Sequence, residues 1–250
     1  MDINIAKAAE IIQTAKHLIA LTGAGVSTES GIPDFRSKGG LWDVYDPAEY
    51  ATIHAFHETP EKVWEMTFAM REITKNAKPN QGHRALAELE KLGILKCIIT
   101  QNIDNLHQEA GSRCVIEYHG NASRLECLKC GKKYGREEYA ANIEKKTPPR
   151  CKKCDSILKL SVIYFGEMIP HEAVARSQEA AQKADAVMVI GTSAVVYPAA
   201  GIPLIAKQHD AVIIEFNTEE TGLTGYATDI FVHGKTGTTL PELLRQIKSS

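Results

Sequence analysis

The sequence predicts an α/β fold in which helices cover both faces of a parallel sheet. Four short runs are mostly apolar, and they alternate with longer stretches whose apolar residues recur at helical spacing. Strands of a parallel sheet have such apolar sequences because both of their faces are buried. The predicted strands are residues 17–22, 95–100, 186–190 and 211–216. The predicted helices are residues 5–16, 60–75, 80–92, 170–184 and 240–248.

Length and composition are those of a soluble globular protein. The chain has 250 residues, of which 44% are hydrophobic and 24% charged, enough for one large domain or two small ones. These proportions exclude a disordered, collagen-like or low-complexity chain. The net charge of −2 gives no reason to expect nucleic acid or a membrane as a partner. Neither a basic leader with an apolar stretch nor a run of ~18 apolar residues is present, so we expect a reducing cytoplasm.

Residues 121–160 differ from the rest of the chain in charge. The segment holds eleven Lys and Arg against five Asp and Glu, a net charge of +6, while the remainder carries −8. It also contains two Cys-x-x-Cys pairs and a Pro-Pro step. We predict a small inserted module at 121–160, together with part of the helical segment 37–78. The larger domain is then built from residues 1–120 and 161–250.

The two Cys-x-x-Cys pairs predict a structural zinc site. Each pair directs two thiolates at one ion, and two pairs separated by 20 residues complete a tetrahedral shell of four thiolates. Because all four ligands are cysteines, no position is left for a catalytic water. The other two cysteines, Cys97 and Cys114, are predicted to be small buried hydrophobic residues. The predicted zinc ligands are Cys127, Cys130, Cys151 and Cys154.

The basic charge around these cysteines leaves a zinc ribbon that binds nucleic acid as an alternative. Only Tyr134 and Tyr139 are interleaved as aromatic residues for stacking on bases. We therefore expect a solvated basic face, or a surface for an acidic region of a partner, and no direct binding of nucleic acid.

A glycine-containing loop follows the first predicted strand. Gly23-Ala24-Gly25 stands where the backbone N–H groups of a nucleotide-binding loop approach a pyrophosphate. Thr28 occupies the place of the usual third glycine, so the loop by itself is equally compatible with a tight turn.

Polar residues follow further predicted strands. The carboxyl ends of parallel strands meet at one edge of a sheet, where α/β proteins place their chemistry. A purely structural role is possible for some of these residues. Either Asn102 or Asp104 could cap the following helix, but a cap would not explain the polar residue Gln101. His119 ends another strand-like run and is either structural or catalytic. Other polar residues at strand ends are Thr192, Ser193, Asn217 and Thr218. With the glycine loop, they predict a Rossmann-like, doubly wound nucleotide-binding domain.

An ordered set of motifs resembles the sirtuin family. In chain order they are GAGVSTESGIPDFR, TQNIDNLH, YHG, the two Cys-x-x-Cys pairs, VIYFGE, GTSAVVYPAA and IIEFN, within residues 21–236. Sirtuins are NAD-dependent protein lysine deacylases. The resemblance implies that NAD is a consumed co-substrate and that acyl-lysine proteins or peptides are the substrates. Nicotinamide and an O-acyl-ADP-ribose are the implied products.

The resemblance also implies roles for single residues. His119 matches the general base that takes a proton from the ribose hydroxyls, and Asn102 matches the residue that orients the ribose and a water. Ile103 and Asp104 match the nicotinamide pocket, and Ser27 supports the glycine loop. Further NAD contacts are implied at Ala24, Thr28, Phe35, Arg36, Gln101, Thr192, Ser193, Asn217, Thr218 and Thr236. The peptide is implied to lie as an added strand against Val162, Phe165, Gly166 and Val195.

One helix bears on the acyl group. Sirtuins that remove succinyl or malonyl groups carry Tyr-x-x-Arg after Val-Trp, and here Thr67 and Met70 occupy these two places. Arg71 comes one residue late, so we expect it to point about 100° away around the helix. The resemblance therefore implies a neutral acyl group, acetyl or a longer aliphatic chain.

Other NAD-dependent activities stay open at this point. ADP-ribosyl transfer to protein is the alternative activity, because it begins with the same cleavage at C1′ of the ribose. A dehydrogenase is the nearest enzyme of a different class. We expect the chain to be a monomer.

Overall fold

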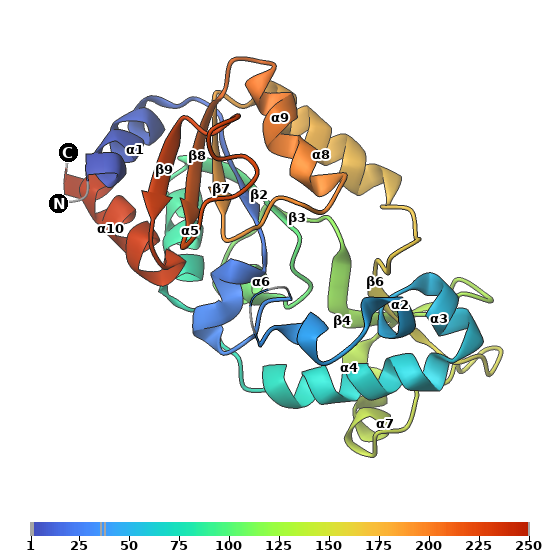
Figure 1. The fold of residues 1–250 in the computed structure, drawn as a ribbon. Helices are drawn as coiled ribbons and strands as arrows, with labels where there is room; N and C mark the ends of the chain where they lie inside the picture. Colours follow the sequence, from blue (N-terminus) through green and yellow to red (C-terminus); the bar gives the residue numbers. More distant parts are fainter. Residues whose placement is uncertain (1–2, 36, 38, 250) are drawn as a thin grey trace.

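A parallel sheet of six strands forms the larger part of the computed structural model, which describes residues 3–35, 37 and 39–249 (Figure 1). The strand order is β3-β2-β1-β7-β8-β9, so the chain builds outward from β1 on one side and then on the other. This is the doubly wound arrangement, and the predicted fold class is confirmed. The strands are β1 Leu18–Thr22, β2 Leu95–Thr100, β3 Val115–Glu117, β7 Ala186–Ile190, β8 Val212–Asn217 and β9 Ile230–His233.

Helices cover both faces of this sheet because its strands carry apolar side chains on both. In β1, Leu18 and Ala20 belong to one core, and Ile19 and Leu21 belong to the other. Helices α1, α5 and α10 pack on the first face, and α8 and α9 pack on the second. These helices are α1 Ile3–Thr14, α5 Gln81–Lys91, α8 His171–Lys183, α9 Ile202–Lys207 and α10 Thr236–Ser249.

The four predicted strands and five predicted helices are all present; β2 and β7 have the predicted bounds, and the others differ at one or both ends. The largest shift is in α10, which begins at Thr236 rather than at residue 240 and continues through Pro241. The sequence does not predict β9, because its four residues at the edge of the sheet are too few to show a periodic pattern.

A second sheet of three antiparallel strands, in the order β5-β4-β6, packs against α3 and α4. Trp64 of α4 lies in the shared core, 2% exposed, and its Nε1 donates to the carbonyl oxygen of Leu158 at 2.8 Å. The elements are α3 Ile53–Glu58, α4 Pro60–Thr74, β4 Gly120–Glu126, β5 Lys133–Gly135 and β6 Lys159–Val162. Shorter elements are η1 Ala24–Ser30, η2 Leu41–Asp43, α2 Pro47–Tyr50, α6 Leu106–Glu109, η3 Arg136–Tyr139, α7 Ala140–Glu144 and η4 Ala199–Gly201.

The strands of the large sheet end level with one another. Thr22 pairs with both Thr100 and Ile190, and Ile190 pairs in turn with Phe216. The residues that follow these strands therefore emerge side by side at one edge.

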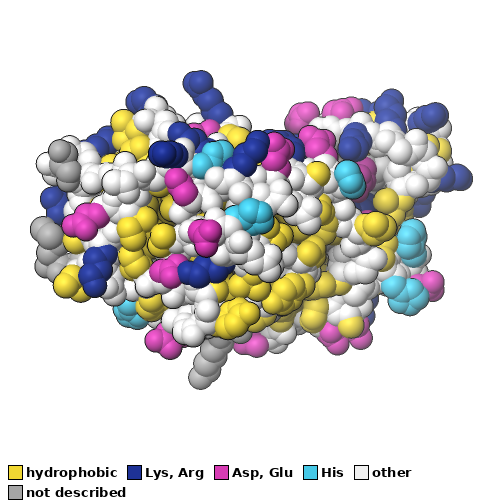
Figure 2. Space-filling model, turned by 90° about the horizontal axis from the view of Figure 1, so that it is seen from above, with side chains coloured by type: hydrophobic (Ala, Val, Ile, Leu, Met, Phe, Trp, Pro, Cys, Tyr) yellow, Lys and Arg dark blue, Asp and Glu magenta, His cyan; other side chains and the backbone are white. Residues whose placement is uncertain are grey.

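Charge on the surface is mixed in sign. Figure 2 shows positive and negative side chains interspersed on the face that it presents. In the basic segment, Lys152 pairs with Glu138 at 2.8 Å, and Arg150 pairs with Asp155 at 3.3 Å. No helix within the described part of the chain has the length and apolar character needed to span a bilayer.

The contact between α4 and the small sheet can be tested at Trp64. Trp64→Phe removes the donor to the buried Leu158 carbonyl and should lower the free energy of unfolding by about 1–3 kcal/mol. Trp42→Phe is the matched control, because the Trp42 indole N–H donates to no group in the described part of the chain. Urea denaturation followed by circular dichroism measures both, and equal losses would contradict the role given to this hydrogen bond.

Candidate active site and zinc centre

A cavity of about 1280 Å³ opens at the level strand ends of the large sheet and extends to β6 and α4. Val195 does not line it and is 54% exposed, while the adjacent Val196 does line it. The predicted contact at Arg36 lies outside the described residues. The predicted site residues that line the cavity are Ala24, Ser27, Thr28, Phe35, Gln101, Asn102, Ile103, Asp104, His119, Val162, Phe165, Gly166, Thr192, Ser193, Asn217, Thr218 and Thr236.

His119 lies half-buried between β3 and β4. Its Nδ1 is 3.1 Å from the carbonyl oxygen of Gln101. A carbonyl oxygen can only accept, so Nδ1 carries the hydrogen and Nε2 keeps its lone pair. Burial lowers the pKa of His119, and the bond to Gln101 offsets part of this effect. The ring is therefore neutral near pH 7 and offers Nε2 as a base.

Asn102, Ser27 and Asp104 form a hydrogen-bonded chain on the cavity wall. Asn102 Nδ2 donates to the Gly23 carbonyl at 3.1 Å and to Ser27 Oγ at 3.2 Å. Ser27 Oγ donates to Asp104 Oδ2 at 2.7 Å, and the Leu106 N–H donates to Asp104 Oδ1 at 2.9 Å. Burial raises the pKa of Asp104, although these two donors favour its charged form. The amide of Asn102 and the carboxyl of Asp104 are thus held in fixed orientations.

A second chain of hydrogen bonds joins the ends of β2, β7 and β8. Gln101 Nε2 donates to Thr192 Oγ1 at 3.0 Å, and Asn217 Nδ2 donates to the Thr192 carbonyl at 3.0 Å. Asn217 Oδ1 accepts from the Thr218 N–H at 2.9 Å. Polar residues that are far apart in sequence are thereby brought to one wall, where hydroxyl and amide groups can bind ribose and phosphate.

The glycine loop serves packing within the protein. Gly25 N–H donates to the Gly191 carbonyl at 2.8 Å, so it is not available to a pyrophosphate as the sequence suggests. A Cβ on Gly25 would lie 2.8 Å from Gly191 Cα, closer than real Cβ atoms approach. The glycine lets the loops after β1 and β7 come into contact.

An aromatic row borders the cavity. Trp42 lies 5.2 Å from Phe35 and 6.3 Å from Phe165, measured between ring centroids. The sequence predicts both phenylalanines as site residues but not Trp42, which no motif marks. The three rings give the cavity an apolar border that links the predicted cofactor loop to the predicted peptide segment, and such a border excludes water.

Helix α4 lines the cavity with a residue, Arg71, that the sequence does not predict there. Arg71 lines the cavity together with Thr67 and Met70. Arg71 follows Met70 about 100° around the helix, and because it comes four residues after Thr67 it shares a face with Thr67. The cavity follows this helix far enough to include Arg71.

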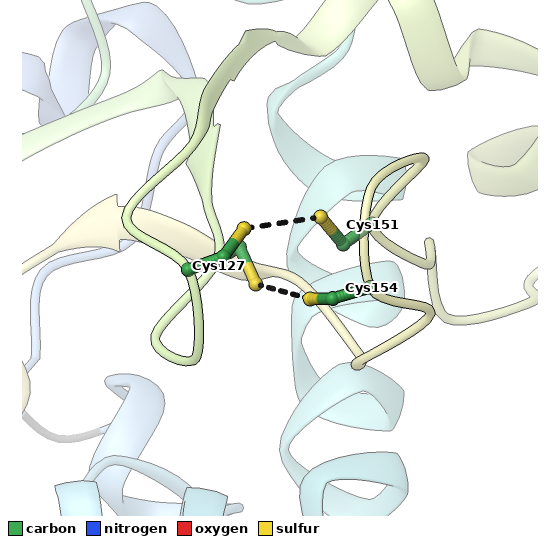
Figure 3. Close-up of side chains that lie close together, drawn as sticks. Cys127, Cys151 and Cys154 are labelled. Carbon is green, nitrogen blue, oxygen red and sulfur yellow. Dashed lines mark hydrogen bonds between the residues drawn. The ribbon is translucent and has the colours of Figure 1, made fainter.

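The four paired cysteines converge in the loops beside the small sheet (Figure 3). Cys127 Sγ is 3.4 Å from Cys154 Sγ, Cys130 Sγ is 3.6 Å from Cys151 Sγ, and all four sulfurs lie within 4.8 Å of one another. Tetrahedral zinc with Zn–S bonds of about 2.3 Å needs sulfurs about 3.8 Å apart. The donor set fits a structural zinc ion.

Comparisons with known proteins identify the family. The Sir2 family model matches residues 23–198, so this chain belongs to the Sir2 family. An NAD-dependent protein deacylase of Thermococcus kodakarensis is 48% identical over 96% of this chain and 95% of the relative. A crystal structure of a Sir2 homologue with NAD has a TM-score of 0.89 and 48% identity over 97% of this chain and 93% of the other. A Sir2 protein bound to a myristoylated histone peptide has a TM-score of 0.86 and 40% identity over 100% and 98%.

Loss of the zinc ligands should unfold the small sheet. Cys127→Ser with Cys130→Ser removes two thiolates, and binding of zinc supplies folding free energy to such modules. We expect loss of bound zinc in elemental analysis and a lower midpoint of thermal unfolding. Cys97→Ser with Cys114→Ser is the control, because neither belongs to the cluster, and it should keep the zinc. A double ligand variant with normal zinc content would contradict the assignment.

Proposed function

We propose that this protein is an NAD-dependent protein lysine deacylase, which moves the acyl group of an acyl-lysine to ADP-ribose and frees the lysine. The observation that carries the proposal is His119, a base with a fixed tautomer, in the same cavity as the predicted NAD and peptide residues. The name of the Thermococcus relative and the NAD complex of the structural neighbour support it.

Individual residues of this chain then have separate roles in the reaction. NAD supplies the bond between C1′ and nicotinamide that breaks in the reaction. His119 takes a proton from a ribose hydroxyl through Nε2, because its Nδ1 is already bonded to Gln101. Asn102 orients the ribose and a water, and Asp104 accepts from the carboxamide of nicotinamide beside Ile103. Phe35 and Trp42 exclude water from the reacting carbon.

The acyl-lysine peptide is proposed to bind beside the segment 162–166. The Ile163 N–H donates to the His119 carbonyl at 2.9 Å, and the Phe165 N–H donates to the Ala51 carbonyl at 2.9 Å. These bonds hold the segment as a rigid edge near the catalytic base. The myristoylated histone peptide of the structural neighbour supports an acyl-lysine peptide as the substrate.

Three wider features complete the proposal. Residues 121–160, with part of 37–78, form a small domain, which the separate sheet and its own core support.

A cytoplasmic location is consistent with four thiolates that bind metal, since such thiolates need a reducing compartment. A monomer is proposed as the active unit.

The test is mass spectrometry of an acetyl-lysine peptide incubated with the protein. Deacetylation only in the presence of NAD, with formation of O-acetyl-ADP-ribose, is the expected result. ADP-ribose attached to protein without any deacylation would replace the proposal by ADP-ribosyl transfer.

Removal of the base should abolish turnover. His119→Ala should lower kcat by about 10²–10⁴-fold, while NAD binding measured by calorimetry is kept, because the base acts in the chemical step. His171→Ala, an exposed histidine on α8 outside the cavity, is the control and should turn over normally. A rate for His119→Ala within about tenfold of the wild type would remove His119 from this role.

The acyl preference follows from Thr67 and Met70. A succinyl carboxylate would end beside these two uncharged side chains, and Arg71 follows Met70 about 100° around the helix, so acetyl-lysine should be cleaved at least about tenfold faster by kcat/KM. Met70→Arg should raise the ratio of succinyl to acetyl turnover. Faster cleavage of the succinyl peptide by the wild type would show this account of the pocket to be wrong.

A further inference from the structure

Two arginines line the cavity away from the strand ends of the large sheet, one on α4 and one in the module of the small sheet. Arg71 comes from α4 and Arg136 from η3 in the small sheet's module, and both line the cavity half-buried. The predicted NAD residues come instead from the glycine loop and the ends of β2, β7, β8 and β9. The two arginines are therefore separate from the region assigned to the pyrophosphate.

Hydrogen bonds tie Arg136 to the reacting centre. Arg136 Nη1 donates to the Ala122 carbonyl at 3.3 Å, and the Ala122 N–H donates to the Ile103 carbonyl at 3.0 Å. Ile103 belongs to the proposed nicotinamide pocket. On α4, Arg71 is one helical turn beyond Thr67. Arg71 and Arg136 therefore line the same cavity as Ile103 of the proposed nicotinamide pocket and Thr67 of the proposed acyl pocket.

Neither guanidinium is neutralised within the described part of the chain, where no ion pair involves Arg71 or Arg136. Glu137 also lines the cavity, but it is exposed and pairs with neither arginine. Burial, and then the charge of Arg71, lower the pKa of Arg136. Two half-buried cations that repel each other favour an anion between them.

We propose that Arg71 and Arg136 bind the terminal carboxylate of a long dicarboxylic acyl group on lysine. The proposal rests on the proposed deacylase function and adds a second class of acyl substrate to the neutral ones. Guanidinium groups match the planar carboxylate and form paired, charge-assisted hydrogen bonds with it. A succinyl group is expected to end near Thr67, and Arg71 lies four residues further along α4, a rise of about 6 Å, so a longer acyl chain is needed to bring the carboxylate to Arg71.

The experiment compares acyl groups of equal length on one peptide sequence. Adipoyl is compared with hexanoyl, and suberoyl with octanoyl, by kcat/KM in the presence of NAD. Because the peptide is constant, an acidic side chain of the peptide cannot produce a difference. The measured quantity is the ratio of dicarboxylic to neutral turnover within each enzyme, which cancels any general loss of activity.

In Arg71→Gln and in Arg136→Gln this ratio should fall at least about tenfold from the wild-type value for one of the two lengths. Arg176→Gln, which removes the same charge from α8 outside the cavity, should leave the ratio unchanged. Thermal unfolding of each variant checks that it is folded. Arg71→Gln is the decisive variant, because the Arg71 side chain donates no hydrogen bond within the described structure and its loss should leave the fold intact. An unchanged ratio in folded Arg71→Gln would overturn the proposal.

A binding measurement separates this proposal from the deacylase function. Affinities of the same four peptides are measured by calorimetry in the absence of NAD, so no turnover is needed. A dicarboxylic preference that Arg71→Gln abolishes supports the subsite even if no acyl peptide is cleaved. Cleavage of acetyl-lysine with no dicarboxylic preference in either assay would overturn the subsite and leave the deacylase function intact.

Discussion

The hydrogen bonds of one residue, Gln101, hold the active-site wall together. Its N–H donates to the Thr22 carbonyl at 3.0 Å, which fixes the end of β2 against β1. Its side chain donates to Thr192 after β7, and its carbonyl accepts from His119 after β3. Four segments far apart in sequence are therefore held by a single residue, placed where the strands of the large sheet end level.

This arrangement decides which chemistry the cavity supports. Because the Gln101 carbonyl occupies Nδ1 of His119, only Nε2 can take a proton, and burial keeps the ring neutral near pH 7. The small sheet supplies the opposite wall through β6 and the segment that follows it. The zinc site and the core around Trp64 fix that wall, so metal and packing act on catalysis through position and not through contact with the reacting atoms.

Much of this could be predicted from the sequence, because local patterns carry it. Mostly apolar runs mark the parallel strands, paired cysteines mark the metal site, and polar residues after strands mark the cavity. The sequence leaves Gln101 unexplained, since its role depends on three partners that only the fold brings together. The place of Arg71 in the cavity is not predicted for a related reason: the angle around a helix is known from sequence, but the extent of the cavity along that helix is not. The Gly25 N–H is bonded to Gly191, a contact that requires the order of strands to be known.

The measurement that tests this account most directly is the nitrogen-15 NMR spectrum of the His119 imidazole as a function of pH, assigned by comparison with His119→Ala. The account predicts the neutral tautomer with hydrogen on Nδ1 and a pKa below the ordinary value of 6.5. Hydrogen on Nε2 in the neutral ring, or a pKa above 6.5, would contradict the claim that the Gln101 carbonyl and burial prepare this histidine to act as the base.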